Sequence, residues 1–412
     1  MPHRRRAVRG TVAGASADLQ EATRATFVSF TANGFAFASW LSCIPQVKGQ
    51  LRLGPSALGL VLLAGGIGAI AGLLLAGPAV ARFGSRRTVA VMSVVSGTGL
   101  LAIAVGYLFG ILPVIVGLVI LSLGQGGWDV AMNTHGTLVE RRLGRSLLPR
   151  FHASYSVGTV SGALMGAALA AARVPVTLHL GVVGVIVASV VPFAVRGFLA
   201  DRPAADAASA SLQVWREPRT LLIGIFILMF AFAEGTGNDW ISVALVGNYR
   251  ATPAAGAAGV AVFLAAMTAG RWFGPSVIGR WGRVRAVGTL GLVAIAGVVL
   301  FCAGIGIPQA LAGAALWGVG ASLGFPVGLS AAADEASMAA ARVSACSSIA
   351  YAAFLAGPSL IGFLGRELGV LRAIASIAIL LAVAVVLVRV IRPVPGALTA
   401  QKPGSTSNQR VQ

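Results

Sequence analysis

Apolar residues dominate the chain from residue 25 to residue 392, and short polar segments interrupt them at regular intervals. A helix needs about 20 apolar residues to cross the hydrocarbon core of a bilayer, and each apolar stretch is about that long. The pattern therefore predicts twelve membrane-spanning helices. We expect them at residues 25–47, 56–80, 88–109, 111–138, 151–172, 175–196, 220–247, 254–279, 286–305, 308–333, 341–364 and 369–391.

The basic residues alternate between the two ends of these expected helices. If the N-terminus lies in the cytoplasm, 24 of the 31 Lys and Arg residues fall in segments on that side, against 6 on the other side. The remaining one, Arg271, lies inside the helix at 254–279. Basic residues favour cytoplasmic loops. We therefore expect a multi-pass protein of the cytoplasmic (inner) membrane with both termini in the cytoplasm.

The longest polar insert between expected helices divides the chain into two six-helix bundles. We place the N-terminal bundle at 25–196, a cytoplasmic linker at 197–219 and the C-terminal bundle at 220–392. The polar segments 1–24, which is basic, and 393–412 are expected to be disordered. The fold class is thus an all-α membrane protein of two pseudo-symmetric six-helix bundles.

The two halves also share sequence features at an offset of about 200 residues. GPAVARFGSRR (77–87) in the first half matches GPSVIGRWGRVR (274–285) in the second, and NGFAFASWLS (33–42) matches EGTGNDWIS (234–242). Parallel repeats of six-helix bundles are a known transporter architecture, and their binding site lies between the halves near the membrane midplane.

Composition supports this class and excludes others. The chain is only 10% charged with a mean hydropathy of +0.87, whereas soluble domains are about 25% charged. The net charge of +19 sits in short loop clusters rather than on one face, so we expect no nucleic-acid partner. Cys43, Cys302 and Cys346 lack metal spacing, and no Walker loop is present. We therefore expect no catalytic site, no metal and no cofactor.

Three of the twelve acidic residues lie well inside expected helices, namely Asp129, Glu234 and Asp239. A carboxylate at membrane depth is costly and usually functional. Asp129 shares a helix face with Gln125 and Asn133, at i−4 and i+4. This stripe is a candidate proton or substrate site, and its alternative is a structural hydrogen-bond cluster. Asp334, Glu335 and Glu140 lie at helix ends, where we expect pairing with loop arginines.

Glu234 lies roughly 20 Å into its helix, and Arg271 about 12 Å from the cytoplasmic end of the next one. Their side chains could meet, either as a static ion pair or as a pair that breaks during transport. Glu234 is also a candidate for proton coupling. Asn238 shares the face of Glu234, whereas Asp239 points about 140° away and is expected nearer the outer surface.

Several aromatic and amide side chains are candidates for a substrate cavity. Asn33, Phe37 and Trp40 lie on one helix face, and Trp240 is the repeat partner of Trp40. A membrane Trp can anchor at the interface or stack on a ligand. The expected cavity set is Asn33, Trp40, Gln125, Asn133, Asn238, Trp240 and Tyr351. His152 is interpreted as a residue at the start of its helix.

The Arg-Phe-Gly-x-x-Arg loop at 82–87, its echo after 254–279 and the two-fold six-helix repeat resemble the major facilitator superfamily. Within it, Gly34-Phe35-Ala36, Ile44-Pro45-Gln46-x-Lys48 and Asp129-x-x-x-Asn133 resemble the fucose-permease branch. AEGTGNDW (233–240), LWGVGASLGFP (316–326) and GTLVERRLGR (136–145) resemble bacterial YbjJ-type inner-membrane transporters. The resemblance implies the major facilitator fold and gating arginines at Arg82, Arg86, Arg280 and Arg283.

Two positions depart from the family pattern. Ala81 occupies the place of the loop motif's Asp, and Leu41 occupies that of a protonatable Asp in fucose permease. The gating ion pair and proton coupling of the family must therefore use other residues here.

These observations predict a monomeric secondary active transporter whose partners are a small-molecule substrate, protons and the lipid bilayer. Export of a metabolite or drug is slightly favoured, because the cavity candidates are mostly uncharged and the acid at position 41 is absent. The alternatives are proton-driven uptake of a sugar-like solute and a transport-inactive membrane sensor or scaffold. A channel would normally show a re-entrant or filter segment, and no such segment interrupts this pattern.

Overall fold

The computed structural model describes residues 2–144, 147–200, 212–335 and 338–393, and it is helical almost throughout. Membrane proteins use such structure because every helical backbone group is satisfied inside its own segment. The α-helices are α1 (Pro2–Gln50), α2 (Pro55–Gly106), α3 (Ile111–Leu143), α4 (Leu148–Ala171), α5 (Val176–Ala194), α6 (Pro218–Gly247), α7 (Pro253–Trp281), α8 (Arg283–Cys302), α9 (Ile307–Ala321), α10 (Gly324–Ala332), α11 (Ala339–Leu368), α12 (Val370–Ala375) and α13 (Ile377–Leu387). Short 3-10 helices follow α5 (Val195–Gly197), precede α6 (Leu212–Arg216) and follow α13 (Val388–Ile391).

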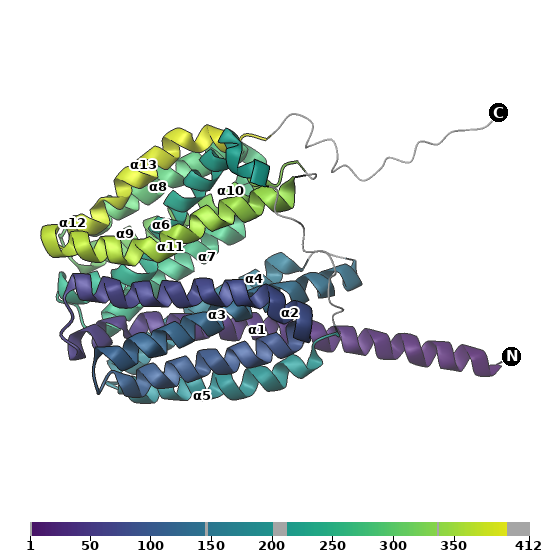
Figure 1. Ribbon diagram of the computed structural model, residues 1–412. Coiled ribbons are helices and arrows are strands. Elements are labelled where there is room, and N and C mark those ends of the chain that lie inside the picture. The colour runs from purple at the N-terminus through teal and green to yellow at the C-terminus, as the bar shows by residue number, and fades with distance from the viewer. Residues whose placement is uncertain (1, 145–146, 201–211, 336–337, 394–412) are drawn as a thin grey trace, which may run out of the picture.

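The helices make twelve crossings, as the hydrophobic pattern predicts. Ten helical segments of the described chain are long and apolar enough to span a membrane. The segment α2 has 52 residues, about 78 Å of helix, and Gly84 (φ 80°, ψ 163°) breaks it into two crossings. The helix α4 supplies the twelfth, since it runs through the bundle beside the others (Figure 1). Two crossings, α9–α10 and α12–α13, are each broken into two helices.

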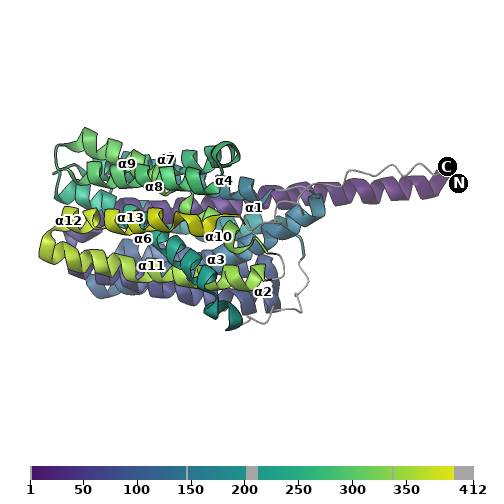
Figure 2. The same cartoon turned by 90° about the horizontal axis from the view of Figure 1, so that it is seen from above.

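The first helix begins earlier than the sequence pattern suggests. It starts at Pro2 rather than near residue 25, and its first turns extend beyond the bundle (Figures 1 and 2). Alanine and arginine are frequent in this segment, and both favour helix. At the other end of the chain, residues 394–412 lie outside the described residues, as do residues 201–211 of the expected linker.

Turn residues set where the helices begin and change direction. Proline occupies the first turn of α2, α4, α6, α7 and α9, where its missing N–H costs nothing. Gly282 adopts φ 75° between α7 and α8, a conformation that a residue with a Cβ rarely takes. The equivalent position in the first half is Gly84, so the shared Gly of the two loops has one physical cause.

The chain folds into two halves that lie against each other, α1–α5 below and α6–α13 above in Figure 1. The helices of both halves run along one common direction in both views (Figures 1 and 2). We call the end that carries Arg82, Arg219 and Arg283 the basic end. The opposite end carries the turns at Arg52 and Arg250.

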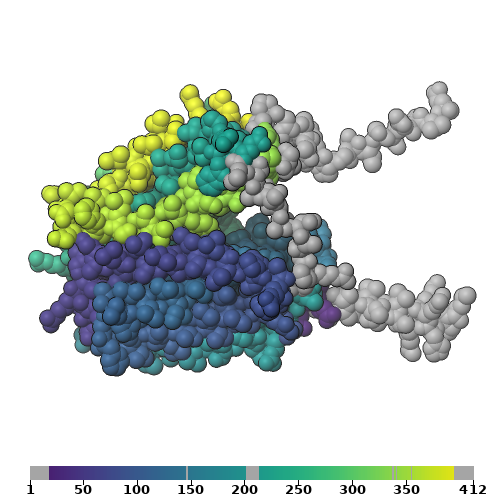
Figure 3. Space-filling model, viewed as in Figure 1, coloured from purple at the N-terminus to yellow at the C-terminus, as the bar shows by residue number. Residues whose placement is uncertain are grey.

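The halves are in close contact at the opposite end and separate toward the basic end. At the opposite end, α2 packs on α11 so closely that a Cβ at Gly59 would lie 2.7 Å from the Pro358 carbonyl oxygen. A Cβ at Gly362 would lie 2.6 Å from the Pro55 carbonyl oxygen. Figure 3 shows a hollow between the halves toward the basic end. The molecule is therefore closed at one end and open at the other.

Glycines that recur every four residues let helices pack closely within each half. Gly162 on α4 faces the α1 backbone at Phe35, and Gly328 on α10 faces Ile227 of α6. Small residues allow such close approach where lipid supplies no hydrophobic driving force. These glycine faces are internal to each half, so they do not form the surface along which the halves meet.

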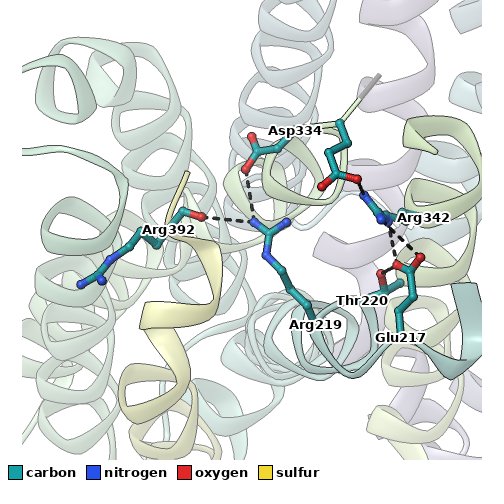
Figure 4. A network of polar contacts seen from close by, with 7 residues as sticks. Glu217, Arg219, Thr220, Asp334, Arg342 and Arg392 are labelled. Atoms are coloured by element: carbon teal, nitrogen blue, oxygen red, sulfur yellow. Dashed lines mark hydrogen bonds and ion pairs between the residues drawn. The ribbon is translucent and has the colours of Figure 1, made fainter. Parts of the chain in front are cut away.

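Ion pairs tie the C-terminal half together at the basic end (Figure 4). Asp334 accepts hydrogen bonds from Arg283 at 2.7 Å and Arg219 at 3.3 Å. Arg342 bridges Glu335 and Glu217, each at 2.7 Å. Hydrogen bonds, first from Arg342 and then from Thr220, hold the pKa of Glu217 below its usual range. The expected pairing of Asp334 and Glu335 with arginines is thus confirmed.

Glu140, the third acid at a helix end, binds backbone amides at the start of α4. Its carboxylate accepts hydrogen bonds from the backbone amides of Leu147 and Leu148, both at 2.7 Å. These amides begin α4 and would otherwise have no intrahelical partner. Glu140 therefore caps α4 from the end of α3.

Candidate functional site

A cavity of about 220 Å³ lies between the two halves, where α1, α2 and α3 face α6 and α11. Its wall is largely apolar, with leucines and glycines from α2 and α3. Its polar and aromatic lining residues are Phe37, Trp40, Ser122, Gln125, Asn238, Asp239 and Tyr351. Small-molecule sites typically combine such an apolar wall with a few polar groups.

Four of the expected cavity residues line this space, namely Trp40, Gln125, Asn238 and Tyr351. The other three, Asn33, Asn133 and Trp240, are not part of its wall. Trp240 is fully buried, and its Nε1 has no hydrogen-bond partner among the described residues. It belongs to the packing of the C-terminal half, because the cavity face of α6 is formed by positions 235, 238 and 239.

Asp239 lines the cavity as well, although it was not among the residues expected there. It lies four residues after Gly235 and beside Asn238, so the three residues form one face of α6. Glu234 lies at the edge of this face and turns toward α7. The expected separation of about 140° between Glu234 and Asp239 therefore places one acid toward α7 and the other at the cavity.

The ion pair of the C-terminal half joins α6, α7 and the end of α9. Arg271 Nη2 donates to both carboxylate oxygens of Glu234, each at 2.8 Å. Arg271 Nε also donates to the Ser322 carbonyl oxygen at 3.3 Å. The Arg271 and Glu234 side chains keep 35% and 17% of their surface accessible, so the pair is only partly buried.

Asp129 in the N-terminal half has an amide partner and no basic one among the described residues. Asn133 Nδ2 donates to its Oδ1 at 3.2 Å and to its backbone oxygen at 2.9 Å. Gln125, the other expected partner, instead donates to Ser96 Oγ at 3.4 Å. The stripe of three polar residues on α3 is therefore divided: Gln125 faces the cavity, and Asp129 and Asn133 lie nearer the basic end.

Two tyrosines lie near Asp129 at the interface between the halves. The Tyr155 hydroxyl of α4 interacts electrostatically with both Asp129 and the Glu234–Arg271 pair. Tyr351 of α11 faces Asp129 across the interface between the halves. Tyr155 was not among the residues expected to line the cavity. In the sequence it is distinguished as a polar aromatic residue in a helix made largely of small residues.

The four candidate gating arginines behave differently from one another. Arg283 pairs with Asp334. Arg82 lies over the Phe83 ring at 5.4 Å. Arg82, Arg86 and Arg280 are exposed at the basic end, and no ion pair joins them to any described residue. The described residues also contain no group of three or more His, Cys, Asp or Glu side chains that could hold a metal ion.

Comparisons with known proteins agree with this architecture. A model of the Major Facilitator Superfamily matches residues 25–340. An uncharacterised MFS-type transporter of Yersinia pestis is 28% identical over 361 residues, which cover 86% of this chain and 92% of that protein.

Solved structures of transporters share the fold. A mutant of the nucleoside transporter NupG superposes with a TM-score of 0.72 at 12% identity, covering 90% of this chain and all of that one. The E. coli fucose:proton symporter FucP superposes with a TM-score of 0.60 at 17% identity, covering 89% and 98%. At these identities the likeness concerns the fold alone.

Proposed function

Because the chain belongs to the major facilitator superfamily, we propose that it is a secondary active transporter that moves a small organic solute by alternating access. It is a multi-pass membrane protein of a transporter family and not an enzyme. We further propose that it acts as a monomer in the cytoplasmic membrane. The basic end then lies in the cytoplasm, because basic residues favour that side.

One observation supports this proposal above the others: the cavity lies between the two halves, closed at one end and open toward the other. With the basic end in the cytoplasm, this arrangement corresponds to an inward-open state. The α2–α11 contact at Gly59 and Gly362 is then the closed outer gate. A sensor or scaffold would not need a cavity that changes access between two sides.

Proton coupling is proposed for Asp129. A carboxyl group in the membrane is costly and marks a proton or ion pathway in many transporters. Asn133 is the one side-chain hydrogen-bond partner of Asp129 among the described residues, and an amide does not fix its charge. Its proton could therefore be gained on one side and lost on the other. Tyr155 and Tyr351 couple this change to the second half of the protein.

Export of an amphipathic metabolite or drug is the proposed direction. The cavity wall is mostly apolar and aromatic, which suits a partly apolar solute better than a sugar. FucP, which shares the fold, is a fucose:proton symporter, so uptake of a sugar-like solute is the second candidate. The same experiment separates the two directions.

The test uses purified protein in proteoliposomes with an imposed pH gradient and a panel of labelled amines, nucleosides and sugars. Wild-type protein is expected to accumulate or extrude at least one solute only while the gradient lasts. Asp129→Asn should abolish gradient-driven transport but retain solute exchange at equilibrium. The matched control is Asp18→Asn, an exposed acid of α1 outside the cavity. Equal gradient-driven transport by wild type and Asp129→Asn would remove Asp129 from the mechanism, and no solute movement at all would contradict the transporter assignment.

A further inference from the structure

Three residues that line the cavity carry hydrogen-bond acceptors without a donor among the described residues. Asn238 is only 7% exposed, and its Oδ1 has no hydrogen-bond partner. The Asp239 carboxylate forms no hydrogen bond or ion pair with the described residues. Gln125 uses its Nε2 to bond Ser96 Oγ, which leaves its carbonyl oxygen as an acceptor. A buried acceptor without a donor is costly, so the Asn238 oxygen indicates a missing partner.

The charge of the cavity is also one-sided. Its wall contains one carboxylate, Asp239, and no Lys, Arg or His. The membrane cation on the neighbouring helix, Arg271, is held by both oxygens of Glu234 and so does not neutralise Asp239. An isolated carboxylate in a low-dielectric site is stabilised by a partner of opposite charge or by a proton, and a cationic ligand supplies the former.

Aromatic rings from both halves surround the same space. Phe37 and Trp40 come from α1, and Tyr351 comes from α11. A cation near the face of an aromatic ring is attracted by the ring quadrupole. The volume of about 220 Å³ is below the roughly 300–1,000 Å³ of sites for drug-sized ligands, which limits the occupant to a small molecule.

We propose that Asp239, Asn238 and Gln125 bind the ammonium group of a small amphipathic organic cation, whose apolar body packs on Phe37, Trp40 and Tyr351. A primary ammonium offers three N–H donors, which matches the three acceptors. Its charge neutralises Asp239, and its binding bridges α3 and α6, one from each half. The inference rests on the proposed transport function and names the substrate class of that cavity.

The experiment measures equilibrium binding to purified protein in lipid nanodiscs at neutral pH without any gradient. Three probes of matched size differ in charge: 2-phenylethylamine, 2-phenylethanol and 3-phenylpropionate. Wild type is expected to bind the amine at least tenfold more tightly than the alcohol, and the carboxylate most weakly. Asp239→Asn should remove the amine preference and leave alcohol binding within about twofold. Asp18→Asn, the matched exposed control, should bind like wild type.

The wild-type comparison alone can overturn the inference, since equal binding of amine and alcohol would mean that the cavity does not recognise charge. Equal weakening of all three probes in Asp239→Asn would also overturn it, because the side chain would then only support the cavity. Should Asp239→Asn fail to fold, Asn238→Leu tests the same site, and it should weaken the amine several-fold more than the alcohol. Amine binding without gradient-driven transport would contradict the transporter proposal and leave this inference intact.

Discussion

The Glu234–Arg271 pair lies at membrane depth. Glu234 is near the middle of α6, about 24 Å along a helix of roughly 45 Å. Arginine cannot lose its proton in a protein, so removing Glu234 leaves a cation without its counter-charge inside the membrane. Breaking a fully buried pair costs about 3–5 kcal/mol, and exposed pairs contribute about 0–1 kcal/mol. The partial exposure of this pair places its expected contribution between these limits.

Glu234→Gln should therefore lower the thermal stability of the protein, and the double variant with Arg271→Gln should recover most of it. The measurement is a double-mutant cycle on the free energy of unfolding in detergent. Transport should return in the double variant if the pair only holds α6 to α7. If the double variant folds but does not transport, Glu234 takes part in the transport cycle. A coupling energy near zero would contradict the geometry of the pair.

At the scale of elements, the contact between α2 and α11 decides which end of the molecule is closed. A Cβ at Gly362 would lie 2.6 Å from the Pro55 carbonyl oxygen, and a backbone atom cannot move aside as a flexible side chain can. Ser56 Oγ also donates to the Gly362 carbonyl oxygen at 3.4 Å. The proposed gate is therefore a backbone-to-backbone contact rather than an ion pair.

Gly362→Ala should separate α2 from α11 and shift the protein toward the state that is open on that side. A cysteine at Ser122 in the cavity, in a background without Cys43, Cys302 and Cys346, should then react faster with a membrane-impermeant thiol reagent added outside cells. Gly49→Ala is the matched control, since a Cβ there meets no atom within 4 Å. An unchanged labelling rate in Gly362→Ala would show that this contact does not close the outer gate.

At the scale of the whole molecule, the asymmetry of basic residues predicts its orientation in the membrane. Gln213 lies in the segment between the halves, and Gln50 lies at the opposite end, where α1 meets α2; both are exposed. In the cysteine-free background, Gln50→Cys should react with impermeant reagent in intact cells. Gln213→Cys should react only after the membrane is permeabilised. The reverse pattern would invert the proposed topology.

Much of this architecture is determined by local pattern. The length of each apolar stretch decides how many times the chain crosses the bilayer, because the thickness of the hydrocarbon core is fixed. Helix length and hydropathy therefore predicted the twelve crossings, and the shared loops at Gly84 and Gly282 predicted the two halves. The acids Asp129, Glu234 and Asp239 could also be identified from the sequence, because a charged residue inside an apolar stretch is costly in lipid.

The sequence could not determine which partner each of these acids meets. In the most apolar stretch of α6, 72% of residues are buried inside the protein, so no lipid-facing stripe marks its orientation. Periodicity therefore failed to show that Asp239 faces the cavity and Trp240 the interior. Likewise, Gln125 bonds Ser96 of α2 rather than Asp129, four residues away on its own helix. The bilayer sets the number and length of the helices along the chain, whereas the contacts among packed helices come from residues far apart in sequence and exist only in the tertiary structure.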